Sequence, residues 1–236
     1  MYMRSCSIIF CFLLGISFTA IGQSDGNYDY SREFIWGINK NTNGGLIGGF
    51  VFKWANALSE NQFKTMGFEL MNVKHPSETR WSLNGKPFLY PKQNYLYSIR
   101  GLYGRDFILF KKAAQQGVQI LYSIAGGPTI GVVAPYYIVT ADGRAEQYDP
   151  NKHTSPANIQ GTGHLFQGLG ESSIKFGLNA KASLSFELGA FKSNVTGFEI
   201  GAQIEAFTEE IVIVPTQPNN AVFTSAFLTF FYGHRK

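Results

Sequence analysis

The strongest constraint on the fold is a two-residue alternation of polar and apolar side chains between residues 177 and 207. From residue 179 to residue 187 the odd positions are polar, whereas the even positions carry Leu178, Ala180, Ala182, Leu184, Phe186 and Leu188. After residues 189–194 the alternation resumes, and its polar face includes Glu199, Gln203 and Glu205. A period of two suits a strand, because on a helix it would scatter the apolar residues around the cylinder. Each half is long enough for a tilted strand that crosses a bilayer, so the pair predicts a transmembrane β-barrel.

Similar alternation along the rest of the chain predicts an all-β fold, a single antiparallel transmembrane barrel in an up-and-down meander of eight strands. The expected strands lie near residues 33–40, 46–55, 62–73, 93 onward, 117–139, 177–188, 195–207 and 221–232. A bulge or bend is expected at the Gly-Gly-Pro sequence of residues 126–128. Ten strands are the alternative, because residues 105–113 would either extend the fourth strand or pair with the residues from 117 onward.

The spacing of the strands predicts long loops at residues 74–92, 140–173 and 208–220. If the N-terminus lies in the periplasm, all three loops are extracellular, and the second and sixth connections are short periplasmic turns. Barrels of the outer membrane have this asymmetry of loop length, which favours eight strands. Both chain ends are then expected in the periplasm.

The N-terminus predicts export. Residues 1–22 have the pattern of a secretory signal peptide, with Arg4 before an apolar run and small residues at the cleavage site. Residues 23–32 then form a polar leader, and residues 33–236 form the barrel. Cys6 and Cys11 are the only cysteines and lie inside the signal, so the mature chain has no cysteine for catalysis or for a lipid anchor.

Composition limits the partners. The chain has 21 Phe, 12 Tyr and 3 Trp, which suits the aromatic girdles of a membrane barrel. Its net charge of +4 is compatible with contacts to anionic outer-membrane lipid and lipopolysaccharide. Nucleic acid is not an expected partner, because the chain is exported and has no basic cluster.

Several segments resemble the small outer-membrane β-barrel proteins of the Bacteroidota. They are the sequence IGQ at residues 21–23, ELMNVKHP at residues 69–76, GGPTIG at residues 126–131 and PYY at residues 135–137. The chain departs from many outer-membrane proteins at its end, where GHRK follows Tyr232 in place of a terminal aromatic residue. The resemblance implies an outer-membrane location and does not imply a substrate.

The inward face of the predicted barrel carries both signs of charge. An eight-stranded barrel has an interior that side chains fill, and buried charges must be paired. We therefore expect an ion-pair network in the lumen rather than a conducting path. Its expected members are Lys53, Glu69, Arg100, Lys181, Glu187, Glu199 and Glu205.

The sequence contains residues that could suggest a catalytic or a metal site, but their spacing favours neither. Small outer-membrane barrels include lipid A deacylases, and the sequence His75-Pro76-Ser77-Glu78 supplies a base, a hydroxyl and a carboxylate. Residues this close on a loop rarely reach triad geometry, so no catalytic residue is assigned. The loop residues His153, His164, Asp142, Glu146 and Asp149 lack the spacing of a preformed metal site, so no metal and no cofactor are expected. His234 is expected in the periplasmic tail.

Two loop segments are candidates for contacts outside the barrel. The third connection is basic and aromatic, and we expect Arg80, Trp81, Lys86 and Lys92 to contact lipid phosphates or a partner protein. Residues 211–214, Ile-Val-Ile-Val, would either extend the strands above the membrane or dock against another protein.

The leading hypothesis is a non-enzymatic outer-membrane barrel with a filled lumen. It would act as a structural or accessory subunit, within an outer-membrane assembly or transport complex that contains other outer-membrane proteins. The alternatives are a hydrolase that modifies outer-membrane lipid, with His75 and Ser77 as its candidates, and a small-solute channel.

Overall fold

The computed structural model describes residues 31–236 except residues 46, 84, 112–116, 165–166 and 189–192. The predicted signal peptide and most of the predicted leader lie outside the described residues. Within the described part of the chain, no helix is long and apolar enough to span a membrane.

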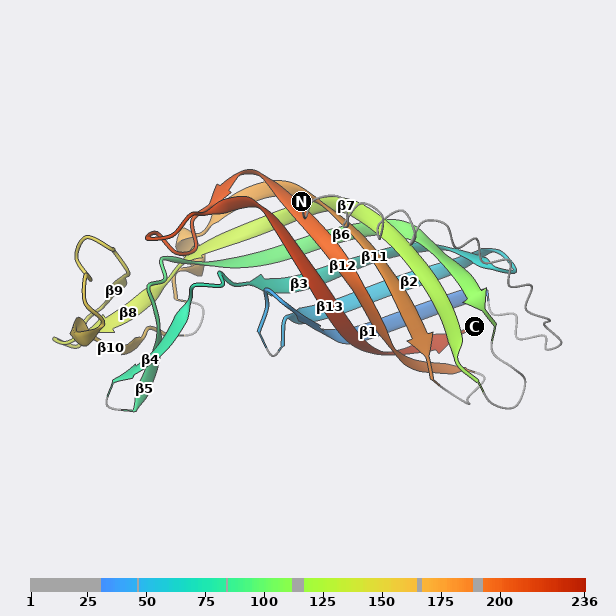
Figure 1. Ribbon diagram of the computed structural model, residues 1–236, viewed down its shortest axis with the longest axis horizontal. Coiled ribbons are helices and arrows are strands. Elements are labelled where there is room, and N and C mark those ends of the chain that lie inside the picture. Colours follow the sequence, from blue (N-terminus) through green and yellow to red (C-terminus); the bar gives the residue numbers. More distant parts are fainter. Residues whose placement is uncertain (1–30, 46, 84, 112–116, 165–166, 189–192) are drawn as a thin grey trace, which may run out of the picture.

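Eight long strands form one closed antiparallel barrel (Figure 1). Around the ring each strand pairs with its neighbour in sequence among the barrel strands, and the first pairs with the last, so the ring is an up-and-down meander. The strands are β1 (Arg32–Asn41), β2 (Gly49–Ser59), β3 (Gln62–Val73), β6 (Asn94–Phe110), β7 (Gln119–Pro135), β11 (Ser173–Glu187), β12 (Asn194–Ile211) and β13 (Asn220–Arg235). The prediction of eight strands is confirmed.

The uncertain region after residue 105 belongs to the barrel. β6 continues without interruption to Phe110 and pairs with β7 down to Ile120, so no additional hairpin forms there. At residues 126–128, where a bulge or bend was predicted, β7 keeps one register with β11, but its pairing with β6 skips Gly127 and Pro128. The last strand is longer than predicted, because β13 extends through residues 233–235 to pair with the start of β1.

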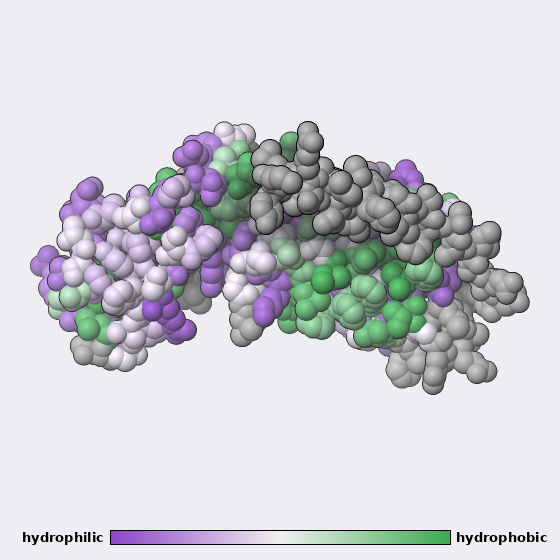
Figure 2. All heavy atoms as spheres, in the orientation of Figure 1, coloured by the Kyte–Doolittle hydropathy of each residue, from purple (hydrophilic) through white to green (hydrophobic). Residues whose placement is uncertain are grey.

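The barrel is inverted relative to a water-soluble protein. On β1 the outward residues Phe34, Trp36 and Ile38 are exposed, whereas the residues between them are buried. Figure 2 shows apolar residues gathered on the visible wall of the barrel and more polar residues over its left end. As predicted, Ile200 is outward and 51% exposed, while Glu187 and Glu199 are inward and buried.

A folded extension lies beyond one end of the barrel, at the left of Figure 1. It contains a hairpin of β4 (Thr79–Leu83) and β5 (Lys86–Tyr90) and a small sheet in the order β10-β8-β9. The sheet strands are β8 (Tyr137–Thr140), β9 (Ala145–Gln147) and β10 (Ile159–Thr162). We call residues 79–90 and 137–162 the outer lobe. The same connection contains two short 3-10 turns, η1 (Pro156–Asn158) before β10 and η2 (Leu169–Glu171) after it.

The outer lobe has an apolar core of its own. Its buried residues are Phe88 on β5, Ile138 on β8, Ile159 on β10, and Tyr136 and Tyr148, which lie next to strands of the small sheet in the sequence. The predicted fifth strand therefore ends early: β7 stops at Pro135, and residues 137–139 belong to the lobe. The predicted loops at residues 74–92 and 140–173 contain these strands because their apolar side chains pack against each other across the two connections.

Candidate functional site

The centre of the lumen holds a charged cluster built from three strands. Arg100 on β6 lies between two carboxylates: Nη2 is 2.8 Å from Oε2 of Glu205 on β12, and Nη1 is 3.4 Å from Oε2 of Glu69 on β3. The hydroxyl of Ser98 donates a further hydrogen bond to Glu205. All three charged side chains are at most 5% exposed. Their inward direction follows from the strand period, which places Ser98 and Arg100 on the same face of β6.

Lys181 on β11 joins this cluster to a third carboxylate. Its Nζ lies 2.9 Å from Oε1 of Glu69 and 3.1 Å from Oε1 of Glu199. The hydroxyl of Ser183 also donates to Glu199. The Lys181 ammonium lies 4.6 Å from the centre of the Phe227 ring, which adds a cation–π contact. Each charge in this group therefore has an opposite charge as a neighbour, as burial requires.

The other two predicted network residues have partners that were not predicted. Lys53 on β2 contacts Asp106 on β6 at 2.8 Å. Glu187 pairs with Arg235 at the end of β13, and Arg235 also pairs with Glu33 at the start of β1. Asp106 was missed because the far end of its strand was uncertain, although its even number places it on the face of Arg100. Arg235 was missed because the tail was not assigned to a strand.

Apolar layers lie on both sides of the charged layer. At the lobe end, Ile211, Ile213 and Val214 pack inward with Phe207 and other residues that include Leu96. Ile213 and Val214 are completely buried, and the Ile213 carbonyl accepts a hydrogen bond from the Gln93 N–H at 2.9 Å. At the opposite end, Ile35, Val195 and Phe231 form a second cluster.

Strand β12 extends to Ile211, the first residue of the run 211–214, whereas Ile213 and Val214 turn inward and are buried. Val212 is 38% exposed, and docking of the run against another protein stays a prediction. We call Ile211, Ile213 and Val214, together with the buried residues that they pack against, the lid. It arises because a β-branched run beside an open barrel end can be removed from water by folding over that end.

Within the charged layer, one void has a volume of about 30 Å³. It is lined by Lys53, Asp106, Lys181, Glu199 and Ser123, among others. The Ser123 hydroxyl has no hydrogen-bond partner among the described residues. A space of this size holds about one water molecule, so side chains fill most of this layer.

The candidate hydrolase residues do not form a catalytic dyad. Nδ1 of His75 accepts a hydrogen bond from the backbone N–H of Ser77 at 3.1 Å, and Nε2 faces the Pro218 carbonyl at 3.3 Å. Glu78 accepts from the backbone N–H of His75 and does not contact its ring. Both ring nitrogens are thus directed at the backbone, and no side chain orients the imidazole toward the Ser77 hydroxyl.

The four predicted contact residues of the third connection are not one patch. Lys92 is completely buried, with Nζ 2.7 Å from Oε1 of Glu78 and 4.4 Å from the centre of the Tyr95 ring. Burial lowers the pKa of the Lys92 ammonium, while Glu78 acts in the opposite direction. Lys92 therefore anchors the connection to the barrel and is not available to lipid or to a partner.

The remaining three residues lie on the hairpin, on both of its faces. Trp81 is opposite Phe88 in the register, and Lys86 is opposite Leu83, so these share the face that packs on the lobe. Arg80 is opposite Leu89 and points to the other face. Arg80 and Lys86 are exposed, and Trp81 is 45% exposed.

Among the histidine and carboxylate residues of the long connection, His153 contacts Glu146 and the backbone of Asp149. His153 is buried, with Nε2 3.0 Å from Oε1 of Glu146 and Nδ1 3.0 Å from the Asp149 backbone N–H. His164 is exposed, and Asp142 pairs with Arg144 instead. No group of three or more His, Cys, Asp or Glu side chains suited to a metal occurs in the described ranges. His234 lies on β13 and contacts Asn194 on β12.

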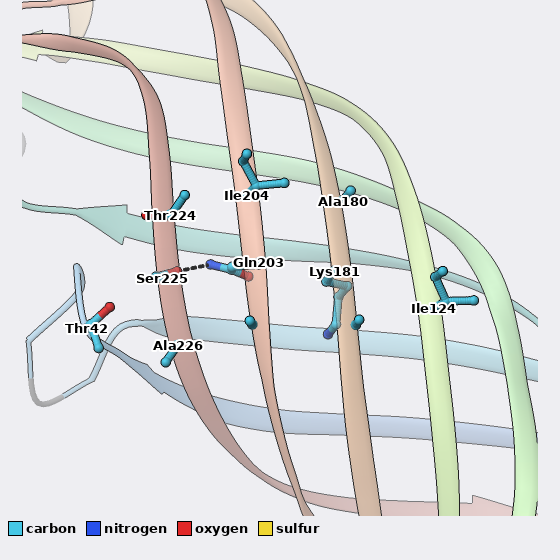
Figure 3. Close-up of a pocket in the computed structure, with 11 residues that line it drawn as sticks. Thr42, Ile124, Ala180, Lys181, Gln203, Ile204, Thr224, Ser225 and Ala226 are labelled. Carbon is cyan, nitrogen blue, oxygen red and sulfur yellow. Dashed lines mark hydrogen bonds between the residues drawn. The ribbon is translucent and has the colours of Figure 1, made fainter. Parts of the chain in front are cut away.

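The outer wall of the barrel has one broad shallow hollow of about 680 Å³ (Figure 3). It forms where Ala182, Ala202 and Ala226 stand side by side on β11, β12 and β13, among larger apolar side chains. Figure 3 shows Lys181, Gln203 and Ser225 on the same three strands, with Gln203 bonded to Ser225. The hollow is thus a dip in the outward surface, and its lining also includes Lys181 of the lumen network.

The chain matches no protein-family model, and no curated protein sequence is significantly similar to it. Among solved structures, Ail of Yersinia pestis in complex with the heparin analogue sucrose octasulfate aligns with 88% of this chain and 100% of its own, at 12% identity and a TM-score of 0.38.

Two further structures align with the same share of this chain. They are the N-terminal β-barrel domain of Pseudomonas aeruginosa OprF (8% identity, 98% of that chain, TM-score 0.37) and Neisserial surface protein A (10% identity, 97% of that chain, TM-score 0.39). None of these proteins is similar enough in sequence to indicate a shared function.

Proposed function

We propose that the protein is an integral outer-membrane β-barrel that serves as an accessory subunit of a larger outer-membrane assembly. In this proposal the barrel is a non-enzymatic, filled anchor, and the outer lobe is the part that meets other proteins. The resemblance to barrels of the Bacteroidota belongs to this proposal, as do the periplasmic position of both termini and contact of the wall with outer-membrane lipid and lipopolysaccharide.

The membrane location is supported by the outward surface of the barrel. Outward residues such as Leu178 (68% exposed) and Phe230 (61% exposed) would each cost free energy in water, because apolar area exposed to water is unfavourable by roughly 25 cal/mol per Å². Such residues recur on every barrel strand, and among the described residues they form a surface larger than soluble monomers tolerate. A lipid bilayer removes this penalty, and the closed ring leaves no unpaired strand edge inside it.

The observation that carries the accessory role is the contrast between a closed lumen and an elaborated lobe. The lid and the charged layer fill the barrel, which supports an anchor more than a conduit. The lobe contains five strands and its own apolar core, more structure than a simple connection between barrel strands requires.

The test is to purify the full chain from cells in a mild detergent and to identify proteins that remain bound by mass spectrometry. We expect stable companions with the wild type and their loss with Ile138→Asp, which places a charge in the lobe core. Recovery of the wild type as a monomer without companions would contradict the proposal. Planar-bilayer recordings complete the test: the filled lumen predicts no steady conductance, and stepwise channel currents would favour a solute channel.

A further inference from the structure

The hairpin of the outer lobe has one covered edge and one free edge. On the β5 side, the Leu89 N–H donates a hydrogen bond to the Tyr136 hydroxyl at 3.0 Å, and β10 contacts β5 more extensively than β4. The stem of Lys86 rests near Gly161 of β10. On the β4 side, no backbone hydrogen bond within the described chain joins Thr79–Leu83 to any strand except β5. Four of the five β4 side chains are exposed, and the fifth is partly so.

The register shows which backbone groups of β4 face outward. In an antiparallel pair, opposed residues alternate between those that exchange both backbone hydrogen bonds and those that direct these groups away. The Leu89 N–H points away from β4, so the pair of Arg80 and Leu89 belongs to the second type. Two positions further along β4, Ser82 is opposite Pro87. Pro87 has no N–H to donate across the pair, which agrees with a pair of the second type at this position as well. The free edge therefore presents the N–H and C=O groups of Arg80 and Ser82.

The charged residues of the hairpin itself have one sign. Residues 79–90 include Arg80 and Lys86 and no acidic residue. Neither cation has an ion-pair partner among the described residues. The preceding acidic residue, Glu78, is already bound to Lys92. Free edges are usually blocked by proline, lysine or a bulge, and β4 has none of these.

We propose that β4 accepts an extended acidic segment of a partner protein as an added strand of the hairpin sheet. This inference rests on the proposed accessory function and names its docking surface. The partner backbone would bond to Arg80 and Ser82, with an acidic side chain beside Arg80 on one face. On the other face an apolar side chain would pack beside Trp81, which lies edge-on to Tyr90 at 6.4 Å between ring centres. Main-chain bonds supply affinity and alternate side chains supply specificity in this mode of recognition.

The test uses a fluorescent seven-residue peptide of alternating glutamate and valine, with a lysine and valine peptide as its comparison. Binding to the full-length protein in detergent micelles is followed by fluorescence anisotropy. We expect the acidic peptide alone to bind the wild type, and its affinity to fall as salt is added.

Two variants separate backbone pairing from charge. Ser82→Pro removes an outward N–H and leaves the pairing with β5 intact, because proline is tolerated where the strand N–H faces solvent. It should weaken binding about tenfold, whereas the matched control Ser82→Ala, which keeps the N–H, should not. Arg80→Glu should lose the acidic peptide and gain the lysine peptide.

The inference is overturned if the wild type does not bind the acidic peptide, or if Ser82→Pro binds it as well as Ser82→Ala does. The companions recovered in mild detergent distinguish this failure from failure of the accessory role. If wild type and Ser82→Pro retain the same companions, the accessory role stands and β4 is not the docking surface.

Discussion

The barrel and the outer lobe differ in the kind of side chain that each buries and in the kind that each exposes. The barrel interior is built from ion pairs around Arg100 and Lys181, and its exterior is apolar. The lobe interior is built from residues such as Phe88 and Ile138, and its exterior is polar. The exterior of the barrel is therefore suited to lipid, and the exterior of the lobe is suited to water. The boundary between the two patterns lies near the lid.

The largest effect is expected for Arg100→Met, which tests whether the barrel interior depends on its ion pairs. This change leaves Glu69 and Glu205 as buried carboxylates without their shared cation, and breaking a buried pair costs about 3–5 kcal/mol. We expect a loss of barrel stability of that size in urea unfolding followed by gel mobility of the folded form. Arg105→Met is the control on the same strand, because Arg105 is exposed. Equal stability of the two variants would show that the lumen does not depend on this ion pair.

The independence of the lobe is tested by Ile138→Ala. Ile138 is completely buried, and such truncations cost about 2–5 kcal/mol. We expect the loss to be confined to the lobe, seen as faster amide exchange and protease cleavage in residues 137–162 with barrel mobility on gels unchanged. If the barrel unfolds together with the lobe, the two regions form one cooperative unit.

The solvent of the barrel wall is tested by Ile200→Lys. Ile200 is outward and exposed, so in water this substitution would change stability by less than about 0.5 kcal/mol. In a bilayer a lysine on the lipid face costs about 2–4 kcal/mol near the midplane. We expect the larger value in unfolding measurements in lipid vesicles. Thr208→Lys, at the lobe end of β12, is the comparison, because the cost should fall there.

The smallest effect is expected for Ser77→Ala. Ser77 is exposed, and its backbone N–H, not its hydroxyl, contacts His75. We expect a stability change within about 0.5 kcal/mol and an unchanged lipid A mass spectrum in cells that express the variant. A lipid A species that depends on both the protein and the Ser77 hydroxyl would instead support a hydrolase.

The sequence predicted side-chain direction best in strands where polar and apolar residues alternate without interruption. Side-chain alternation on β11 and β12 placed Lys181, Glu199 and Glu205 inward, because a strand with lipid on one side and side chains on the other has two distinct faces. It did not show which charges pair. Pairing depends on register between strands far apart in the sequence, as for Lys181 and Glu69.

The sequence was least informative in the long connections. Lys92 was expected to contact lipid phosphates or a partner because its connection is basic and aromatic, whereas its neighbours Glu78 and Tyr95 explain its buried position. Short strands such as β8 and β9 carry too few residues to show a period, and contacts between the connections fix them. Ile213 and Val214 were recognised as apolar, but the barrel end that covers them is formed by residues distant in the chain.

The Arg100 and Lys181 cluster has a consequence for how the ring is completed. Arg100 on β6 pairs with Glu205 on β12, and Lys181 on β11 pairs with Glu69 on β3, so both pairs join strands that are not neighbours in the ring. In a flat or half-built sheet, Glu205 would be separated from Arg100 and Glu69 from Lys181. Partly assembled sheets are therefore less stable than the closed barrel. The buried charges favour closure in the correct strand order, because only that arrangement pairs them.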